Sequence, residues 1–139
     1  MSGFILDTDT LSLFEQGHPV VCQKILARGL SELAITVISV EEQLSGWYTA
    51  LRQARRTDEL VRVYQHITDT IKFFSNLEVI SFSASAVAVY ERLKKQRLNV
   101  SKMDVRIAAI ALEREACIVT RNTRDFCRIS GLQVTDWSS

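Results

Sequence analysis

Four acidic side chains are the residues of this sequence best suited to chemistry. Asp7, Glu42 and Asp125 each come shortly after a short apolar run, and Asp104 stands at the start of a helical pattern. Carboxylates gathered in one place repel one another, so they stay ionised together only around a cation. A site of oxygen ligands suits Mg²⁺ or Mn²⁺. Such an ion activates water and supports in-line displacement at a phosphodiester, which is the chemistry these residues predict.

Other catalytic and metal-binding patterns are missing from the sequence. It has no P-loop, no G-x-G-x-x-G motif and no Ser-His-Asp set that would compete with the acidic residues. The three cysteines, Cys22, Cys117 and Cys127, form no C-x-x-C pair, and the two histidines have no matching ligand spacing. These counts argue against a disulfide framework and against a zinc site.

The pattern along the chain alternates short strands with longer helices. Apolar, β-rich runs predict strands at 4–6, 34–37, 79–82, 117–120 and 133–134. Apolar residues at helical spacing predict helices beginning near 9 or 10 and over 18–29, 39–55, 57–75, 83–95 and 102–115. Strands that are apolar throughout and alternate with helices predict an α/β fold, with a parallel sheet covered by helices on both faces.

The predicted sheet brings the acidic residues to one edge. In such sheets, sites form at the carboxyl ends of the strands. Asp7 and Asp125 follow the first and fourth strands, and Glu41 and Glu42 follow the second. Asp104 lies in the helix that leads into the fourth strand, on the same face as Ala108 and other small residues. We therefore expect acids far apart in the sequence to converge.

Each acid also has a structural interpretation. Asp7 could form an Asx turn or cap a helix. Asp9 is interpreted as the N-cap of the first helix in preference to a metal ligand. Asp104 in a first turn is favoured by the helix dipole, although an unpaired charge on an inward face is costly. Asp125 suits the cap or support of a short helix.

Periodicity does not decide between Glu41 and Glu42. Neither lies on the apolar stripe of the predicted helix, and Ser39-Val40-Glu41-Glu42 has the form of a capping box, with Glu42 folding back to the Ser39 amide. Position after the second strand places a first-turn glutamate at the rim of the site, and the residues alone leave the choice between the two open.

Two further groups of side chains suggest partners. Three arginines near the fourth strand either contact phosphate or are solvated: Arg121, Arg124 and Arg128. A second basic group is interpreted as a solvated helix end: Arg92, Lys94, Lys95, Arg97 and Lys102. Trp47 and Tyr48 lie about 100° apart on one helix, so we expect at least one to be exposed for a protein contact.

Length and composition set broad limits. The 139 residues predict one domain over 1–139, and 47% hydrophobic residues supply a normal core. The formal net charge is +1, so a nucleic acid must be met by local patches. No apolar run approaches the roughly 20 residues that span a bilayer, and we expect a cytoplasmic protein with no membrane partner.

Three blocks of the sequence resemble a known family. "FILDTDTLS", "ISVEEQLSGW" and "SKMDVRIAAIALEREACIVTRNTRDFCRISGLQVTDW" are similar, in order and spacing, to PIN-domain ribonucleases of the VapC toxin type. The resemblance implies a three-layer α/β/α sandwich, Mg²⁺ or Mn²⁺ dependence and endoribonuclease activity. It also implies a homodimer and a cognate antitoxin whose tail covers the cleft.

The resemblance also assigns site residues. Asp7, Glu42, Asp104 and Asp125 fall on the acidic positions of the family, and two further residues, Thr120 and Asn122, fall near its site. Many members have Asn where this chain has Asp9, and the added charge there either binds metal or caps the helix.

Two alternatives from other classes stay open at this point. "FILDTDTL" fits the D-x-D-x-T strand end of haloacid-dehalogenase-like phosphatases, with Asp7 as nucleophile and Asp9 as acid/base. Such a phosphatase also needs a late paired-acid motif, which the chain lacks. A non-catalytic domain that only binds a partner is expected to have lost acids, and all four are present.

Overall fold

Five parallel strands form the centre of the molecule. The computed structural model describes residues 3–139. The strands pair in the order β3-β2-β1-β4-β5, and every neighbouring pair is parallel. Their bounds are Phe4–Leu6 (β1), Leu33–Thr36 (β2), Glu78–Ile80 (β3), Cys117–Val119 (β4) and Gln133–Thr135 (β5). The predicted strands are confirmed, with ends that shift by one or two residues.

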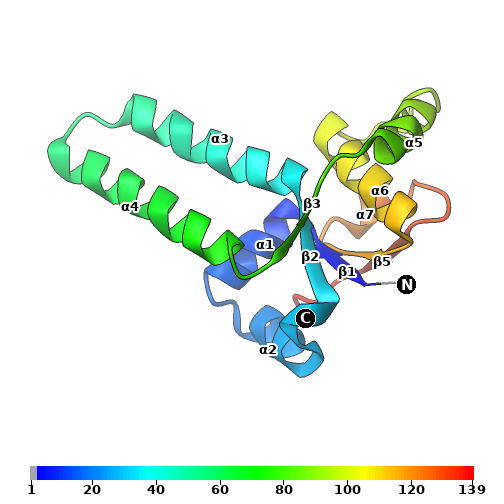
Figure 1. Ribbon diagram of the computed structural model, residues 1–139, viewed down its shortest axis with the longest axis horizontal. Coiled ribbons are helices and arrows are strands. Elements are labelled where there is room, and N and C mark those ends of the chain that lie inside the picture. The colour runs from blue at the N-terminus through cyan, green and yellow to red at the C-terminus, as the bar shows by residue number, and fades with distance from the viewer. Residues whose placement is uncertain (1–2) are drawn as a thin grey trace.

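Helices connect the strands and cover both faces of the sheet (Figure 1). They are Thr8–Glu15 (α1), Pro19–Arg28 (α2), Val37–Gln53 (α3), Thr57–Phe74 (α4), Ala84–Lys94 (α5), Lys102–Arg114 (α6) and Thr123–Phe126 (α7), with a 3₁₀ turn at Leu30–Glu32. The predicted α/β/α sandwich is confirmed. Among the described helices, none is long and apolar enough to cross a membrane.

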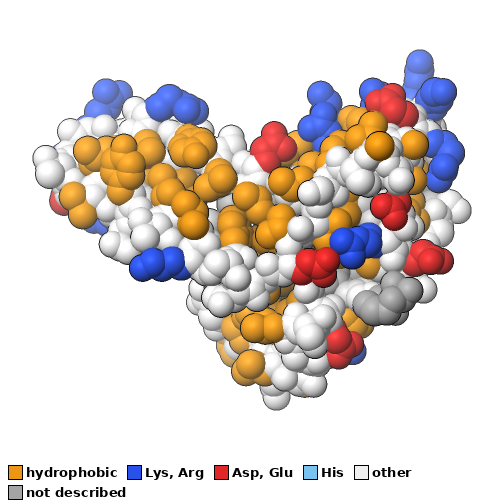
Figure 2. All heavy atoms as spheres, viewed as in Figure 1, with side chains coloured by type: hydrophobic (Ala, Val, Ile, Leu, Met, Phe, Trp, Pro, Cys, Tyr) orange, Lys and Arg blue, Asp and Glu red, His pale blue; other side chains and the backbone are white. Residues whose placement is uncertain are grey.

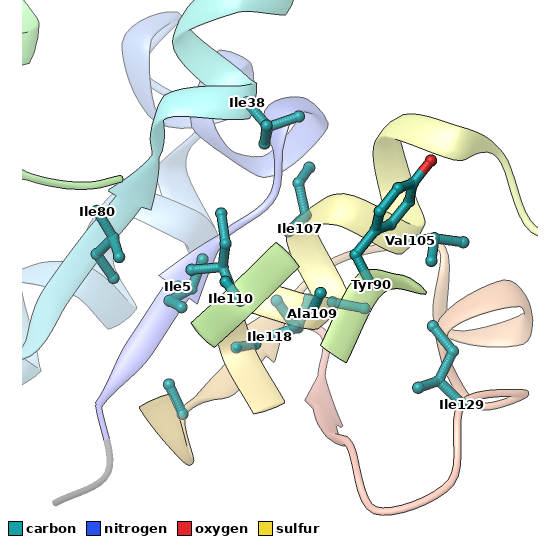
Figure 3. Packing of buried hydrophobic residues seen from close by; sticks show 14 of the residues in the cluster. Ile5, Ile38, Ile80, Tyr90, Val105, Ile107, Ala109, Ile110, Ile118 and Ile129 are labelled. Atoms are coloured by element: carbon teal, nitrogen blue, oxygen red, sulfur yellow. The ribbon is translucent and has the colours of Figure 1, made fainter. Parts of the chain in front are cut away.

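Alternate residues of the three inner strands, β1, β2 and β4, supply two separate cores. On one face, Ile5 and Ile118 pack with α5 and α6 residues such as Tyr90 and Ile110 (Figure 3). On the other face, the neighbouring strand residues pack with α1 and α2: Leu6 and Val119 with Leu11, Val21 and Ile25. This two-sided burial explains why the inner strands are largely apolar rather than alternating, whereas the edge strands β3 and β5 carry exposed residues.

Helices α3 and α4 form a long hairpin that projects from the sheet, on the left in Figure 1. Trp47 holds the two helices together: its ring stacks on His66 at 4.7 Å between centroids, and its Nε1 donates to Thr70 Oγ1 at 3.0 Å. Tyr48 is 50% exposed, as expected for one of the two aromatic residues. Hydrophobic side chains cover much of the hairpin surface seen in Figure 2.

Candidate metal centre

Asp7 is buried at the carboxyl end of β1, with 5% of its surface exposed. One carboxylate oxygen accepts the Thr10 amide at 2.8 Å, so Asp7 caps α1, and the other accepts from the hydroxyl of Thr120 at the end of β4. Burial raises the pKa of Asp7, the hydrogen bonds act against this rise, and the charge of Asp9 adds to it. Asp7 therefore caps α1 and also lies at the strand end where the site is expected, so its structural role does not exclude a role in chemistry.

A chain of hydrogen bonds runs from Asp7 to Asp125. Thr120 donates its hydroxyl proton to Asp7 and accepts the Asn122 amide at 2.8 Å, and Asn122 Nδ2 donates to Asp125 Oδ2 at 3.0 Å. Asp125 lies in the short helix α7, where it also pairs with Arg128 at 3.5 Å. Thr120 and Asn122 therefore link two of the candidate acids, through contacts that cross the edge of the sheet.

Asp104 is half-buried in the first turn of α6, where Ser101 Oγ accepts its backbone amide at 3.2 Å. Burial is the main cause that raises the pKa of Asp104, and the charges of Asp7, Glu42 and Asp125 raise it further. Salt screens charges that lie more than about 10 Å apart, so the four acids share one electrostatic neighbourhood.

Glu42 is half-buried and faces α1. Thr8 Oγ1 donates to Glu42 Oε1 and lies 3.0 Å from Ser39 Oγ. The capping-box interpretation of Glu42 is wrong: the Ser39 amide donates to Thr36 Oγ1 at 3.2 Å, because Thr36 caps a helix that begins at Val37. The Glu42 carboxylate is therefore not engaged at the end of its own helix.

The expectation that Asp9 caps the first helix is also wrong. Asp7 is the cap, and Asp9 is the second residue of α1. Arg121 donates two hydrogen bonds to the Asp9 carboxylate, at 2.7 and 2.8 Å. Both side chains of this pair are about half exposed, at 50% and 48%. An Asp9 carboxylate paired with a guanidinium is not available as a free ligand, so we place it outside the proposed metal set.

The donor set suits a hard divalent cation. All four candidate side chains present carboxylate oxygens, and hydrogen bonds from Thr8, Thr120 and Asn122 orient three of them. Within residues 3–139, no three His, Cys, Asp or Glu side chains stand close enough to hold an ion. The four acids therefore lie in one region, but their side chains are spaced too widely to form a complete ligand set. Mutual repulsion, which a bound cation relieves, is consistent with this spacing.

Thr8 and Ser39 are site residues that the sequence did not point to. The Thr8 hydroxyl contacts Glu42, 34 residues further along the chain, and the Ser39 hydroxyl, 31 residues further along. The only local signal is that Thr8 comes directly after Asp7, at the same strand end.

A groove of about 750 Å³ between α1, α3 and α4 opens beside the acids. Thr8 and Glu42 are part of its lining, and Trp47 and Phe73 form apolar walls. Gln43 and Glu15 also line the groove, and Gln43 Nε2 donates to Glu15 Oε1 at 2.6 Å. Of the four candidate acids, Glu42 is the one that lines this groove.

Comparison with known proteins decides the family. The chain is 37% identical over 142 residues to the "tRNA(fMet)-specific endonuclease VapC" of Shigella flexneri, covering 99% of this chain and 100% of that protein. The chain belongs to the VapC family. The protein of the same name from Salmonella typhimurium is 26% identical over 141 residues. No family model matches the chain.

The fold agrees with this assignment. A crystal structure of DNA-bound VapBC from Salmonella typhimurium matches with a TM-score of 0.77 and 26% identity, over 99% of both chains. This VapC chain is accordingly an endoribonuclease with the PIN-like sandwich. VapC ribonucleases in general use a divalent metal ion. The phosphatase alternative is excluded.

The two neighbouring glutamates are separated by a matched pair of substitutions. If Glu42 is a metal-site residue, we expect Glu42→Gln to lower the rate of RNA cleavage by at least about tenfold, because the charge that would hold the ion is lost. Glu41 is exposed, so Glu41→Gln should cleave at the wild-type rate. Single-turnover rates and thermal unfolding of both variants check this, with both proteins folded. An inactive Glu41 variant beside an active Glu42 variant would show that the neighbours were assigned the wrong way round.

Proposed function

We propose that this VapC protein hydrolyses RNA at a centre in which Asp7, Glu42, Asp104 and Asp125 hold Mg²⁺ or Mn²⁺. The observation that carries the proposal is the gathering of acids at one edge of the sheet: hydrogen bonds through Thr120 and Asn122 join Asp7 to Asp125. In agreement, burial and the charges of the other three carboxylates raise the pKa of Asp104. Acids on separate elements have no structural need to share a half-buried site, because each carries a desolvation cost there.

The residues of the chain have separate tasks in this proposal. Asp7 is fixed by two donors at the base of the site, and Thr120 and Asn122 hold Asp125 in line with it. Thr8 holds one oxygen of Glu42, which leaves its other oxygen free to face the ion. When bound, the ion supplies charge stabilisation for the phosphodiester displacement and lowers the pKa of a water molecule.

We infer that the substrate is a transfer RNA of the initiator type. The Shigella and Salmonella relatives are both named as tRNA(fMet)-specific endonucleases, and both align over 99% of this chain. Specificity for one folded RNA requires contacts beyond the cleaved bond, which the basic side chains around the centre are able to supply.

A cognate antitoxin and a second copy of the chain are the proposed protein partners. The Salmonella structure is of a VapBC assembly, which supports an antitoxin partner here. Exposed apolar side chains on the hairpin support protein contacts as well: Tyr48, Leu60, Val61, Tyr64 and Ile71 are 41–63% exposed. The homodimer and the covering of the cleft by the antitoxin tail stay predictions.

One experiment tests both substrate and partner. Purified protein with Mg²⁺ should cut initiator transfer RNA and leave the elongator methionine transfer RNA intact, and the product of the neighbouring small reading frame should suppress cutting. Denaturing gels of the two RNAs, with and without that product, give the result. Equal cutting of both RNAs would overturn the initiator assignment, and cutting that is indifferent to the added protein would overturn the antitoxin assignment.

A further inference from the structure

A run of positive charge borders the candidate centre on its α5–α6 side. Residues 92–102 contain five cations and no acid: Arg92, Lys94, Lys95, Arg97 and Lys102. Lys and Arg side chains gather over the α5 end of the molecule in Figure 2. Lys94 pairs with Glu91 at 3.4 Å, whereas the other four make no ion pair among the described residues. We call residues 95–102 the basic loop.

The basic loop has a fixed shape. Arg97 and Asn99 adopt left-handed backbone conformations, with φ of 50° and 58°. The Arg97 amide bonds to the Lys94 carbonyl at 3.3 Å, and Arg128 donates to the Asn99 carbonyl at 2.9 Å. Asn adopts such a conformation readily, whereas an arginine keeps it only where its surroundings hold it. The cations of the loop are therefore presented in a set arrangement around a cavity of about 210 Å³ lined by Lys94, Arg97 and Lys102.

The basic loop is joined directly to the acidic centre. Arg128, which bonds to Asn99 in the loop, also pairs with Asp125 at 3.5 Å. Ser101, the last residue before α6, caps the helix turn that carries Asp104. Two of the four candidate metal ligands are thus connected to the loop: Asp125 through Arg128, and Asp104 through Ser101.

The other approach to the centre has the opposite charge. Among the described residues lining the groove between α1, α3 and α4 are Glu15, Glu42 and Asp69, and none is Lys or Arg. An RNA backbone carries one negative charge per nucleotide, so it is repelled along this groove and attracted along the basic loop. With a formal net charge of only +1, this local difference decides the direction of approach.

We propose that the basic loop binds phosphates of the RNA substrate next to the bond that is cut, with Arg97 and Lys102 as the principal contacts. This inference rests on the proposed function and adds the direction in which the strand crosses the site. RNA is favoured over an acidic protein or an anionic membrane because the cations are physically continuous with the RNA-cleaving centre.

The test is a double variant with a charge-matched control. Arg97→Asn with Lys102→Gln removes both cations, and Asn tolerates the left-handed backbone at position 97. The control, Arg62→Gln with Lys72→Gln, removes two exposed cations from α4 on the hairpin. Fluorescence anisotropy of a fluorescein-labelled transfer RNA, in EDTA and over a range of salt, measures binding without cleavage. Initial cleavage rates with Mg²⁺ give kcat and KM.

We expect the loop variant to bind RNA about tenfold more weakly at moderate salt, with a salt slope smaller by about 2, or about 1 per lost phosphate contact. Its KM should rise by a similar factor while kcat changes less than about twofold, because no proposed metal ligand is altered. The control should match the wild type in both assays.

Two results would overturn the proposal. One is a loop variant that binds RNA with the wild-type affinity and salt slope, in which case the ribonuclease assignment stands and the direction of approach is wrong. The other is a loop variant that keeps RNA binding but loses binding to phosphatidylserine vesicles, which would make the loop a membrane contact. If the wild type cleaves no RNA at all, the proposed function fails, and the anisotropy measurement still decides the phosphate contacts.

Discussion

Replacing Asp104 with Asn is expected to lower RNA cleavage by about 100-fold or more while leaving the metal-free protein as stable as the wild type or more stable. A metal ligand contributes several kcal/mol to transition-state stabilisation, and about 1.4 kcal/mol corresponds to a factor of ten in rate. The same carboxylate is unfavourable for folding without metal, because burial and three neighbouring acids oppose its charge.

The sign of the stability effect follows from the raised pKa of Asp104. Its folded-state pKa lies above the unfolded value, so the folded protein binds the proton more tightly and loses stability as pH rises through the folded pKa. At neutral pH the ionised carboxylate is therefore destabilising, and Asn removes this effect. Asp7, whose pKa is also raised, acts in the same direction, so the metal-free wild type should become more stable when pH is lowered from 7 towards these pKa values.

Thermal unfolding in EDTA and in Mg²⁺ separates the two roles of Asp104. The wild type should gain thermal stability from Mg²⁺, because an ion that binds only the folded state stabilises it, and the variant should gain less. Asp69→Asn, an exposed acid on α4, is the matched control and should behave as the wild type. An Asp104 variant with wild-type cleavage would make Asp104 a helix-dipole residue and nothing more.

The sheet and its site edge were predictable because both depend on local patterns. Five apolar runs between helices require a sheet buried on both faces, and Asp7 at the end of the first run is placed at the site edge by that topology alone. The half-buried position of Asp104 was predictable from its place on a face of small residues. The links through Thr120 and Asn122 were indicated only by family resemblance.

Contacts between distant residues account for what could not be predicted. Asp9 and Arg121 are 112 residues apart, and no local rule shows that an arginine after β4 neutralises an acid at the start of α1. Thr36 and Ser39 are both good helix caps, and only the packing of β2 decides that Thr36 is used. That choice starts α3 at Val37 and leaves Glu42 to accept its hydrogen bond from Thr8.

Removal of divalent metal is expected to have the largest effect on activity. Without a cation, four acids in one neighbourhood present only negative charge to a phosphodiester, and no histidine is among the proposed site residues to replace the ion. We expect EDTA to reduce cleavage to the background rate, and Mg²⁺ or Mn²⁺ added in excess to restore it fully. Ca²⁺ should restore much less, because its longer and more flexible ligand distances fit the reaction geometry poorly.

The most direct test of the carboxylate-held metal is the cleavage rate of EDTA-treated wild-type protein and of Asp104→Asn during titration with Mn²⁺. The wild type should pass from background to full activity along a saturable curve, whereas the variant should stay at least about 100-fold below it at every concentration. Cleavage by the wild type that persists in excess EDTA, or identical titration curves for the two proteins, would contradict the account.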